Sequence, residues 1–485
     1  MKIHHWLPFL VFFILSFSAY NYFPPIWPDE ALFFSPAFEY YANGILRTTV
    51  EAGLIPGMDT HTLWMPPVYF ILLSKIFYIF PASIETGRIF SSVVAALSAL
   101  ILYSICRELC NKKVNPHFLF SILLTDFLFI RNSHIIRMES VCLFFGLVSL
   151  YFISRGFSNQ ERKLKIYETG FSGFFLGLSF LSHPFGIYFS VLIFIMLLVR
   201  KQFKPYEIGS IVVVFFITLI PWFIYVFPNW EIFKIQFGAQ LARKKELLEK
   251  FGFFDKMKII ISSFYLPYLK IIVFFLLSIN LLYIYIIKKW DKILSLFTGW
   301  FLITIIFLFI STESWYVYYL VPPLSLILYY LYLKKNFMTQ TLAMLCLAYN
   351  LLVIGMFIYK NYIKVSIPKA TMEYFSQIDK MVDSKKNIYL QAIPDPYFYL
   401  SKKYPDKNFF EFIPGELPIP DSFKNELEKT IASQDVFIFY NEDLMNNYIR
   451  DYLTRNINEF DKKFIYISSA ENSDIKLEAV VYIKK

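Results

Sequence analysis

The sequence predicts an all-α polytopic membrane protein with about eleven spanning helices and further interfacial helices, followed by a small C-terminal α/β domain. The 485 residues are 57% hydrophobic and 20% aromatic, with a mean hydropathy of +0.49, whereas soluble chains are roughly 45–50% apolar. The excess lies in long blocks with few charges, such as 211–227, 271–287 and 296–310. Because the chain turns hydrophilic near its end, we expect a membrane domain over 1–361 and the α/β domain over 362–485.

Short runs of basic residues between the apolar blocks set the expected topology. A first, uncleaved span over 6–23 starts in the cytoplasm, and the positive-inside rule keeps the short basic loops there. The acidic outer segment, 24–87, then lies outside, and its apolar stretch 67–80 is too short to span, so we interpret that stretch as interfacial or re-entrant. Reading that stretch as a true span would place the basic loops outside. The protein is therefore expected in a bacterial inner or cell membrane, with its active site and C-terminal domain extracytoplasmic.

One outer loop does not fit the charge rule. Residues 229–258 carry Arg243, Lys244, Lys245 and Lys250 together with several acids. Their spacing predicts an amphipathic helix on the surface, with its charges facing water. The formal net charge of +10 does not indicate a nucleic-acid partner, since most basic residues follow the topology pattern. The four cysteines lie in or beside spans and are expected to be structural.

The hydrophilic tail alternates strand and helix patterns, which is typical of a small α/β domain. We expect strands at 387–391, 436–440, 464–468 and 478–483, and helices at 423–432 and 443–456. With eleven spans before it, this domain lies outside.

The predicted topology brings distant polar residues to the outer face of the membrane. Ionisable groups near membrane depth are costly and are usually functional or paired. The residues concerned are Asp29, Glu30, His61, Arg137, Glu139, His183, Glu313, Tyr316 and Tyr318.

Each of these residues has a chemical role and a simpler alternative. Asp29 suits a general base, although an acidic first turn of a helix after Pro28 also explains it. Arg137 suits an anionic phosphate with Glu139 orienting it, or the two form an interfacial pair. His183 could contact phosphate or metal, or belong to a turn.

The tyrosines and the acids leave two further alternatives open. The hydroxyl groups of Tyr316 and Tyr318 could hold a phosphate, or their rings could belong to an aromatic belt. His61, Glu139 and Glu313 could hold a divalent cation, but no spacing in the sequence is diagnostic of a metal site. The sequence contains no nucleotide-binding loop, dinucleotide fingerprint, zinc-protease motif or nucleophile elbow.

Several short motifs, in order, resemble the GT-C class of membrane glycosyltransferases, and in particular glycosyltransferase family 39, which includes protein O-mannosyltransferases and the lipid A aminoarabinose transferase. The resemblance covers about 360 residues, and the tail is similar to the extracytoplasmic domain of the lipid A branch. The motifs are Trp-Pro-Asp-Glu-Ala at 27–31, Met-Pro-Pro-Val-Tyr-Phe at 65–70, Glu-Thr-Gly-Arg at 85–88, Arg-Met-Glu at 137–139, Pro-Trp at 221–222, and Trp-Tyr-Val-Tyr-Tyr-Leu-Val-Pro at 315–322.

This resemblance implies inverting transfer of a sugar from a polyprenyl-phosphate donor to a glycolipid, glycan or protein acceptor. Asp29 would be the catalytic carboxylate and Glu139 the second acid. The implied substrate-binding residues are Glu30, Arg88, Arg137, His183, Tyr316 and Tyr318. The chain departs from the pattern at Met65, where relatives often carry a charged residue or His, so a metal or acceptor contact there is not implied. His183 stands where the lipid A branch has a basic residue.

A lipid or lipid-linked-sugar transporter is the main alternative from another class. Transporters typically show inverted repeats and interrupted helices near the midplane. Here the polar residues gather at one face, beside a soluble tail, which favours an enzyme. A structural anchor for the tail would not need acids and bases to converge.

Overall fold

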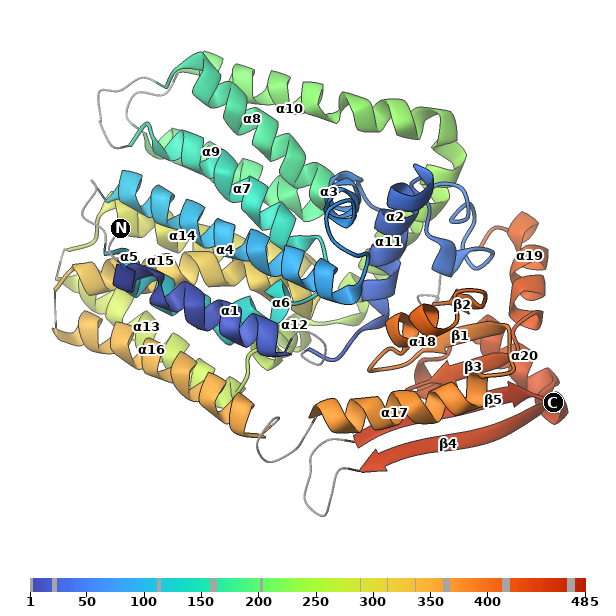
Figure 1. Ribbon diagram of the computed structural model, residues 1–485. Helices are drawn as coiled ribbons and strands as arrows, with labels where there is room; N and C mark the ends of the chain where they lie inside the picture. The colour runs from blue at the N-terminus through green and yellow to red at the C-terminus, as the bar shows by residue number, and fades with distance from the viewer. Residues whose placement is uncertain are drawn as a thin grey trace.

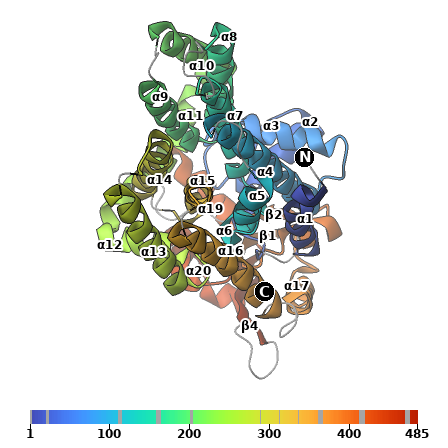
Figure 2. The same ribbon diagram turned by 90° about the vertical axis from the view of Figure 1, so that its left-hand side faces the viewer.

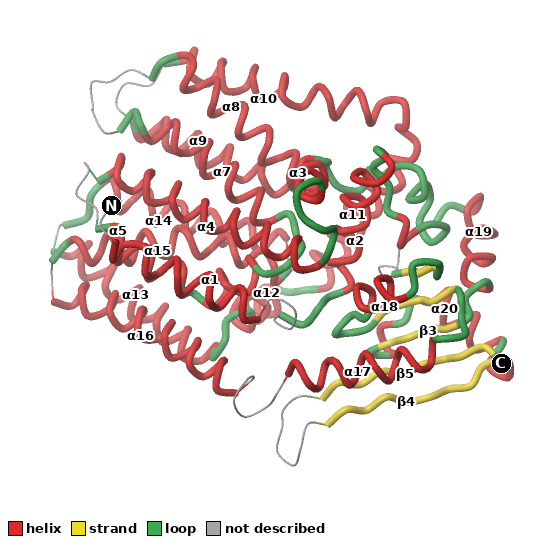
Figure 3. The backbone as a smooth tube through the Cα atoms, in the orientation of Figure 1, coloured by secondary structure: helices red, strands yellow, loops and turns green. Residues whose placement is uncertain are grey.

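The computed structural model describes residues 3–19, 24–110, 115–157, 164–200, 204–287, 289–311, 313–335, 337–360, 367–411, 419–468 and 476–485. A bundle of long helices carries a small α/β domain at one end (Figure 1). In the described residues the strands all belong to this small domain (Figure 3).

Each of the eleven predicted spans corresponds to helical structure. In chain order the helices are α1 (Leu7–Ala19), α4 (Ile84–Leu109), α5 (Pro116–Leu124) with α6 (Phe127–Ser133), α7 (Glu139–Ser154), α8 (Ile166–Ser182), α9 (Tyr188–Val199), α10 (Pro205–Val226), α13 (Pro267–Ile286), α14 (Lys292–Ser311), α15 (Val321–Leu333) and α16 (Phe337–Ile358). Among the described residues, 6 helical segments are long and apolar enough to cross a membrane, and several others are shorter. The protein is thus an integral membrane protein, and the number of spans stays a prediction.

The third predicted span is two helices rather than one. The break lies at Asp126, whose carboxylate accepts hydrogen bonds from the backbone N–H groups of Leu128 (2.9 Å) and Phe129 (3.3 Å) and so caps α6. The same carboxylate lies 3.3 Å from Nζ of Lys270 on α13. A buried carboxylate needs such partners, and the helix start and the lysine together supply them.

The two ends of the bundle differ in charge. The ends of α4, α7, α9 and α15 and the start of α14 lie on the left of Figure 1, far from the small domain. In the sequence these helix ends carry Arg107, Arg155, Arg200, Lys334 and Lys292. We call this the basic end, and the opposite end the domain end. Basic residues gathered at one end are what the positive-inside rule requires.

Four helices lie across the domain end: α2 (Pro28–Asn43), α3 (Val68–Phe77), α11 (Trp230–Lys250) and α12 (Phe253–Ser262). Helix α3 has 10 residues, about 15 Å at 1.5 Å per residue, which is half of a hydrocarbon core of about 30 Å. The stretch 67–80 therefore contains a short helix that cannot span, as predicted.

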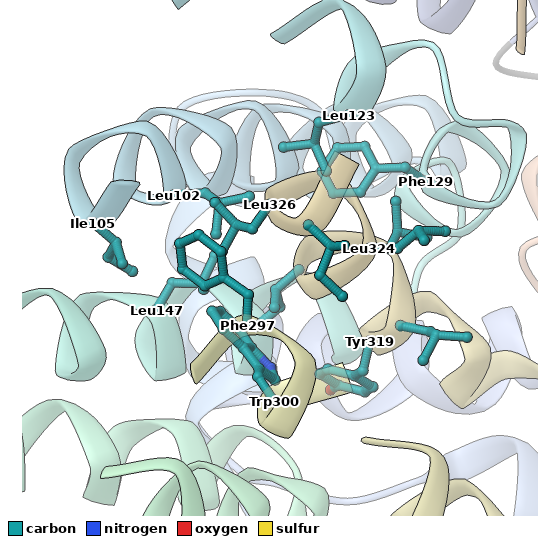
Figure 4. Packing of buried hydrophobic residues seen from close by; sticks show 14 of the residues in the cluster. Leu102, Ile105, Leu123, Phe129, Leu147, Phe297, Trp300, Tyr319, Leu324 and Leu326 are labelled. Carbon is teal, nitrogen blue, oxygen red and sulfur yellow. The ribbon is translucent and has the colours of Figure 1, made fainter. Parts of the chain in front are cut away.

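The bundle is centred on α15, around which other helices are arranged when it is viewed along its length (Figure 2). Its side chains interdigitate with those of neighbouring helices in a continuous apolar core (Figure 4). In a membrane such packing, rather than water exclusion, holds helices together. The core includes Leu102 and Ile105 of α4, Leu123 of α5, Leu147 of α7, Phe297 and Trp300 of α14, and Leu324 and Leu326 of α15.

The small domain is a mixed five-stranded sheet with helices on both faces. Its strands are β1 (Asn387–Gln391), β2 (Asn408–Phe410), β3 (Val436–Phe439), β4 (Phe460–Ser468) and β5 (Lys476–Lys484), in the order β2-β1-β3-β5-β4. Strand β1 is parallel to β2 and β3, whereas β5 is antiparallel to β3 and β4. The helices are α17 (Ile367–Val382), α18 (Tyr397–Lys403), α19 (Asp421–Ala432) and α20 (Asn447–Arg455).

Successive side chains along each strand point to opposite faces of this sheet, as the pleat requires. Ile388 and Leu390 pack with residues of α17, whereas Tyr389 and Phe437 pack with residues of α19 and α20. The four predicted strands and two predicted helices are present, while β2, α17 and α18 were not predicted. The proposed boundary at 361/362 lies outside the described residues.

The small domain is docked onto the outer segment. Backbone N–H groups of Asp395 and Glu411 donate hydrogen bonds of 2.8 Å to the carbonyl oxygens of Ile26 and Val50. The Phe34 ring of α2 meets the Phe398 ring of α18 edge to face, with centroids 5.1 Å apart. The domain thus contacts two stretches that lead directly into the candidate site.

Candidate active site

A cavity of about 420 Å³ opens at the domain end of the bundle. The outer segment, α11 and the start of the 3-10 helix η5 (Ser314–Leu320) form its walls. The charged and hydroxyl-bearing side chains that line it are Asp29, Glu51, Arg137, Arg243, Glu313, Ser314 and Tyr316. Of the residues predicted from sequence, Asp29, Arg137, Glu313 and Tyr316 are therefore brought together, although they are far apart in the chain.

Asp29 lies in the first turn of α2, whose backbone enters the helix through Trp27 and Pro28. Its carboxylate pairs with Nη1 of Arg137. Burial raises the pKa of Asp29, and the Arg137 charge opposes that shift. The result is a carboxyl group that reaches the cavity and is held by an arginine.

Arg137 is the centre of the charge network. Its Nη2 lies 2.8 Å from Oε1 of Glu139, and its guanidinium stacks on the rings of Trp315 (4.9 Å) and Phe33 (5.1 Å). Glu139 itself is only 3% exposed and does not line the cavity. Because two carboxylates already bind this arginine, it is fixed in position beside Asp29.

Glu30 and Arg88 lie behind the cavity rather than in it. Both side chains are fully buried and form a two-pronged ion pair, with Nε–Oε2 at 2.9 Å and Nη2–Oε1 at 2.5 Å. The Glu30 carboxylate also accepts a hydrogen bond of 3.0 Å from the backbone N–H of Ile136. This pair therefore joins α2, α4 and the stretch before Arg137.

His183 reaches the cavity only through Tyr316. Its Nδ1 accepts a hydrogen bond of 3.0 Å from the backbone N–H of Phe185, so the neutral ring carries its proton on Nε2, which lies 3.1 Å from the Tyr316 hydroxyl. Burial lowers the pKa of His183 to about 4, in keeping with a neutral ring. Tyr318 is fully buried, stacks on Phe129 and does not line the cavity.

Two cations on α11 belong to the site, although the charge spacing of this segment predicts that they face water. Nη2 of Arg243 lies 2.7 Å and Nζ of Lys244 lies 2.6 Å from Oε1 of Glu313. Lys244 also lies over the Tyr316 ring at 4.8 Å. Other charged side chains of this helix do face water, among them Lys245 with 77% and Glu249 with 70% of the side chain exposed. The prediction that this helix turns all its charges outward is wrong, because the helix covers the cavity.

The position of these cations in the sequence held a usable signal. Basic residues on the side that the positive-inside rule leaves free of them need a reason to be there, and binding an acid of the site is such a reason. Glu51 was also missed as a site residue, since a lone acid in a long loop carries no pattern.

The three candidate metal ligands do not meet. His61 lies beside the Tyr225 ring, Glu139 is bound by Arg137, and Glu313 is bound by Arg243 and Lys244. Within the described part of the chain there is no group of three or more His, Cys, Asp or Glu side chains suited to a metal ion.

Comparison with known proteins gives a family match over part of the chain and a similar fold over nearly all of it. The sequence model of the family described as dolichyl-phosphate-mannose-protein mannosyltransferase matches residues 65–225. No curated protein matches the chain in sequence. Two crystal structures of ArnT from Cupriavidus metallidurans, one bound to undecaprenyl phosphate and one in the apo state, have a similar fold, with TM-scores of 0.58 and 0.60. The sequence identity is 12% in both cases, and each match covers 98% of this chain and 97% of the ArnT chain.

A further match is the protein O-mannosyltransferase Pmt1-Pmt2 complex of S. cerevisiae bound to the sugar donor. It has 15% identity and a TM-score of 0.31, and covers 47% of this chain and 34% of that chain.

The fold and the family match agree on the class of protein. The chain has the GT-C fold of membrane glycosyltransferases, as the ordered motifs predicted, with the helical bundle, the interfacial helices and the small domain all within the region similar to ArnT.

Proposed function

We propose that this protein is an inverting glycosyltransferase that moves a sugar from a polyprenyl-phosphate donor to a glycolipid, glycan or protein acceptor on the extracytoplasmic side of the membrane. The observation that carries the proposal is a cavity that holds a half-buried carboxyl group, Asp29, together with a cluster of cations, at the end of an apolar bundle. The ArnT structure bound to undecaprenyl phosphate, which shares the fold, supports a lipid phosphate as the carrier.

The charges of the cavity suit a phosphate leaving group. Arg137 is already neutralised by Asp29 and Glu139. Arg243 and Lys244, in contrast, share the single carboxylate of Glu313, which leaves one positive charge for an anion. We therefore assign the phosphate to these two residues, and to Arg137 the role of holding Asp29.

The reaction then follows from the positions of these groups. Asp29 takes the proton of an acceptor hydroxyl as its oxygen bonds to the anomeric carbon of the donor. The bond from that carbon to the phosphate oxygen breaks, and polyprenyl phosphate leaves with the electron pair. Glu139 acts as a positioning residue for Arg137, and His183 for Tyr316, whose hydroxyl can stabilise the phosphate.

The change Asp29→Asn tests the proposal. Asparagine keeps the shape of the side chain but cannot accept the proton, so transfer should fall by about 10²- to 10⁴-fold. The measurement is release of free polyprenyl phosphate by the purified, reconstituted protein given a lipid-linked sugar and candidate acceptors. Asp59→Asn, which removes an exposed acid of the same outer segment, should keep full activity.

Two results would overturn this function. Wild-type turnover by the Asp29→Asn protein would remove Asp29 from the reaction. Movement of an intact lipid-linked sugar across the bilayer, without cleavage, would identify a transporter instead. Mass spectrometry of envelope lipids and glycans, with and without the protein, then identifies the acceptor.

A further inference from the structure

Glu51 is a buried carboxyl group in the wall of the cavity, and the roles assigned above do not use it. It ends the short helix η2 (Thr49–Glu51), is 2% exposed as a residue, and lines the same cavity as Asp29. The negative charge of Asp29 acts on it, so the two carboxyl groups are close enough to influence each other.

The backbone around Glu51 is fixed on several sides. The N–H groups of Leu54 and Ile55 donate hydrogen bonds to the Glu51 carbonyl oxygen, at 3.0 and 3.2 Å. The N–H of Thr49 donates to Oγ of Ser35 on α2, at 3.0 Å, and Val50 accepts the 2.8 Å bond from Glu411 of the small domain. The side chain is thus held in the cavity wall by α2 and by the small domain together.

The Glu51 carboxyl group differs from the other acids near the cavity. Glu30, Glu139 and Glu313 each bind an arginine. Within the described ranges, neither an ion pair nor a side-chain hydrogen bond is formed by Glu51, and its environment consists of burial and the Asp29 charge. A buried polar group without a partner is costly, so such a group in a cavity wall is suited to meet a ligand.

We propose that Glu51 binds a hydroxyl group of the bound substrate and thereby positions it against Asp29. The inference rests on the proposed glycosyltransferase function and adds a specificity residue to it. The hydroxyl can belong to the donor sugar or to the acceptor, and the geometry requires only that it faces the η2 side of the cavity.

The neutral acid is the form that fits this role. Burial, followed by the charge of Asp29, raises the pKa of Glu51 to about 8. The group therefore keeps its proton at pH 7 and can both donate to and accept from a hydroxyl group. Above that pKa it becomes a second negative charge near Asp29, which disfavours the base and the phosphate alike.

Other charged groups share the surroundings of Glu51. Around the cavity these are Asp29 of α2, Arg137 before α7, Arg243 of α11, and Glu313 with Tyr316 near η5. On the side of the small domain, Glu411 follows β2. Of these, Asp29 is the group whose charge is felt at Glu51.

The variants Glu51→Gln and Glu51→Ala separate hydrogen bonding from bulk. Glutamine keeps a donor and an acceptor, so it should retain most of kcat/KM at pH 7, whereas alanine should lose about tenfold or more. In the wild type, activity should decline as the pH rises through about 8, and in Glu51→Gln this decline should be absent. Thermal unfolding of each variant shows whether the fold is kept.

Substrates that lack one hydroxyl group locate the contact. Two series, one of deoxy donors and one of deoxy acceptors, are compared in the wild type and in Glu51→Ala. With the wild type, the analogue that lacks the contacted hydroxyl should react more slowly than the full substrate. With Glu51→Ala the two should react at similar rates, because the partner of that hydroxyl is already gone. The series in which this happens identifies the source of the hydroxyl group.

The outcomes keep this inference separate from the function on which it rests. An active wild type with an equally active Glu51→Ala, or with the same alkaline decline in Glu51→Gln, would overturn the role of Glu51 alone. A folded wild type that never releases polyprenyl phosphate would overturn the glycosyltransferase function instead.

Discussion

Two adjacent acidic residues of this protein, Asp29 and Glu30, have different surroundings. Asp29 and Glu30 follow each other in the first turn of α2, yet one carboxylate lines the cavity and the other is fully buried against Arg88. Successive side chains on a helix point about 100° apart, since a turn takes 3.6 residues. A motif therefore indicates that both acids matter, but the position of each on the helix determines which one meets the substrate.

The Glu30 pair is expected to hold the fold. Glu30→Gln removes the carboxylate from a fully buried ion pair and takes this counter-ion away from Arg88, which typically costs about 3–5 kcal/mol. The expected result is a markedly lower unfolding temperature of the purified protein in detergent.

The matched change for this test is Glu231→Gln on α11. Glu231 pairs with Lys234 at 2.6 Å, and 80% and 51% of these two side chains are exposed, so the loss should be about 0–1 kcal/mol. Equal losses for the two variants would contradict a structural role for Glu30.

At the level of elements, α11 determines the shape of the site. The side chain of Gln236 on this helix joins it to the outer segment through three hydrogen bonds. Its Nε2 donates to the carbonyl oxygens of Pro56 and His61, both at 2.9 Å, and its Oε1 accepts from the N–H of Leu63 at 2.7 Å. The helix thereby holds the loop that forms the opposite wall of the cavity.

Gln236→Ala should loosen this wall. The variant loses three hydrogen bonds, each worth about 0.5–1.5 kcal/mol, and the loop that carries Glu51 is no longer held to α11. Turnover should fall by about ten- to a hundredfold, because small displacements of reacting groups are costly.

Steady-state release of polyprenyl phosphate measures this effect. Lys245→Ala on the same helix removes an exposed side chain and should leave turnover unchanged. If both variants behaved alike, α11 would not be holding the loop through Gln236.

At the scale of the whole molecule, the small domain and the outer segment form one structure. Gly53 shows how closely they fit: its backbone has φ +70, and a Cβ atom there would clash with Thr430 of α19. The two backbone hydrogen bonds to Ile26 and Val50 lie just before Asp29 and Glu51 in the chain. The domain is thus expected to be required for turnover.

Gly53→Ala tests this docking. A left-handed alanine costs about 1–2 kcal/mol, and the contact with Thr430 adds to that cost by pushing α19 away. We expect lower thermal stability and lower turnover, with partial recovery in the double variant Gly53→Ala/Thr430→Ala.

Gly44 provides the control for Gly53. It has φ +71 with no atom within 4 Å of an added Cβ, so Gly44→Ala reports the backbone cost alone. If the two single variants lost equal stability and turnover, the docking contact would have no measurable effect.

The sequence by itself determined the helical blocks of the bundle, four of the five strands of the small domain, and that Asp29 and Arg137 share a site. These features follow from hydrophobic block length, from the placement of basic residues and from motif order, all of which are local. Only the tertiary structure decided that Glu30, Arg88, Glu139, His183 and Tyr318 stand behind the cavity. It also brought Glu51, Arg243 and Lys244 into the site, because the direction of a side chain and the neighbour that it meets depend on how distant helices cross and not on the residues beside it in the chain.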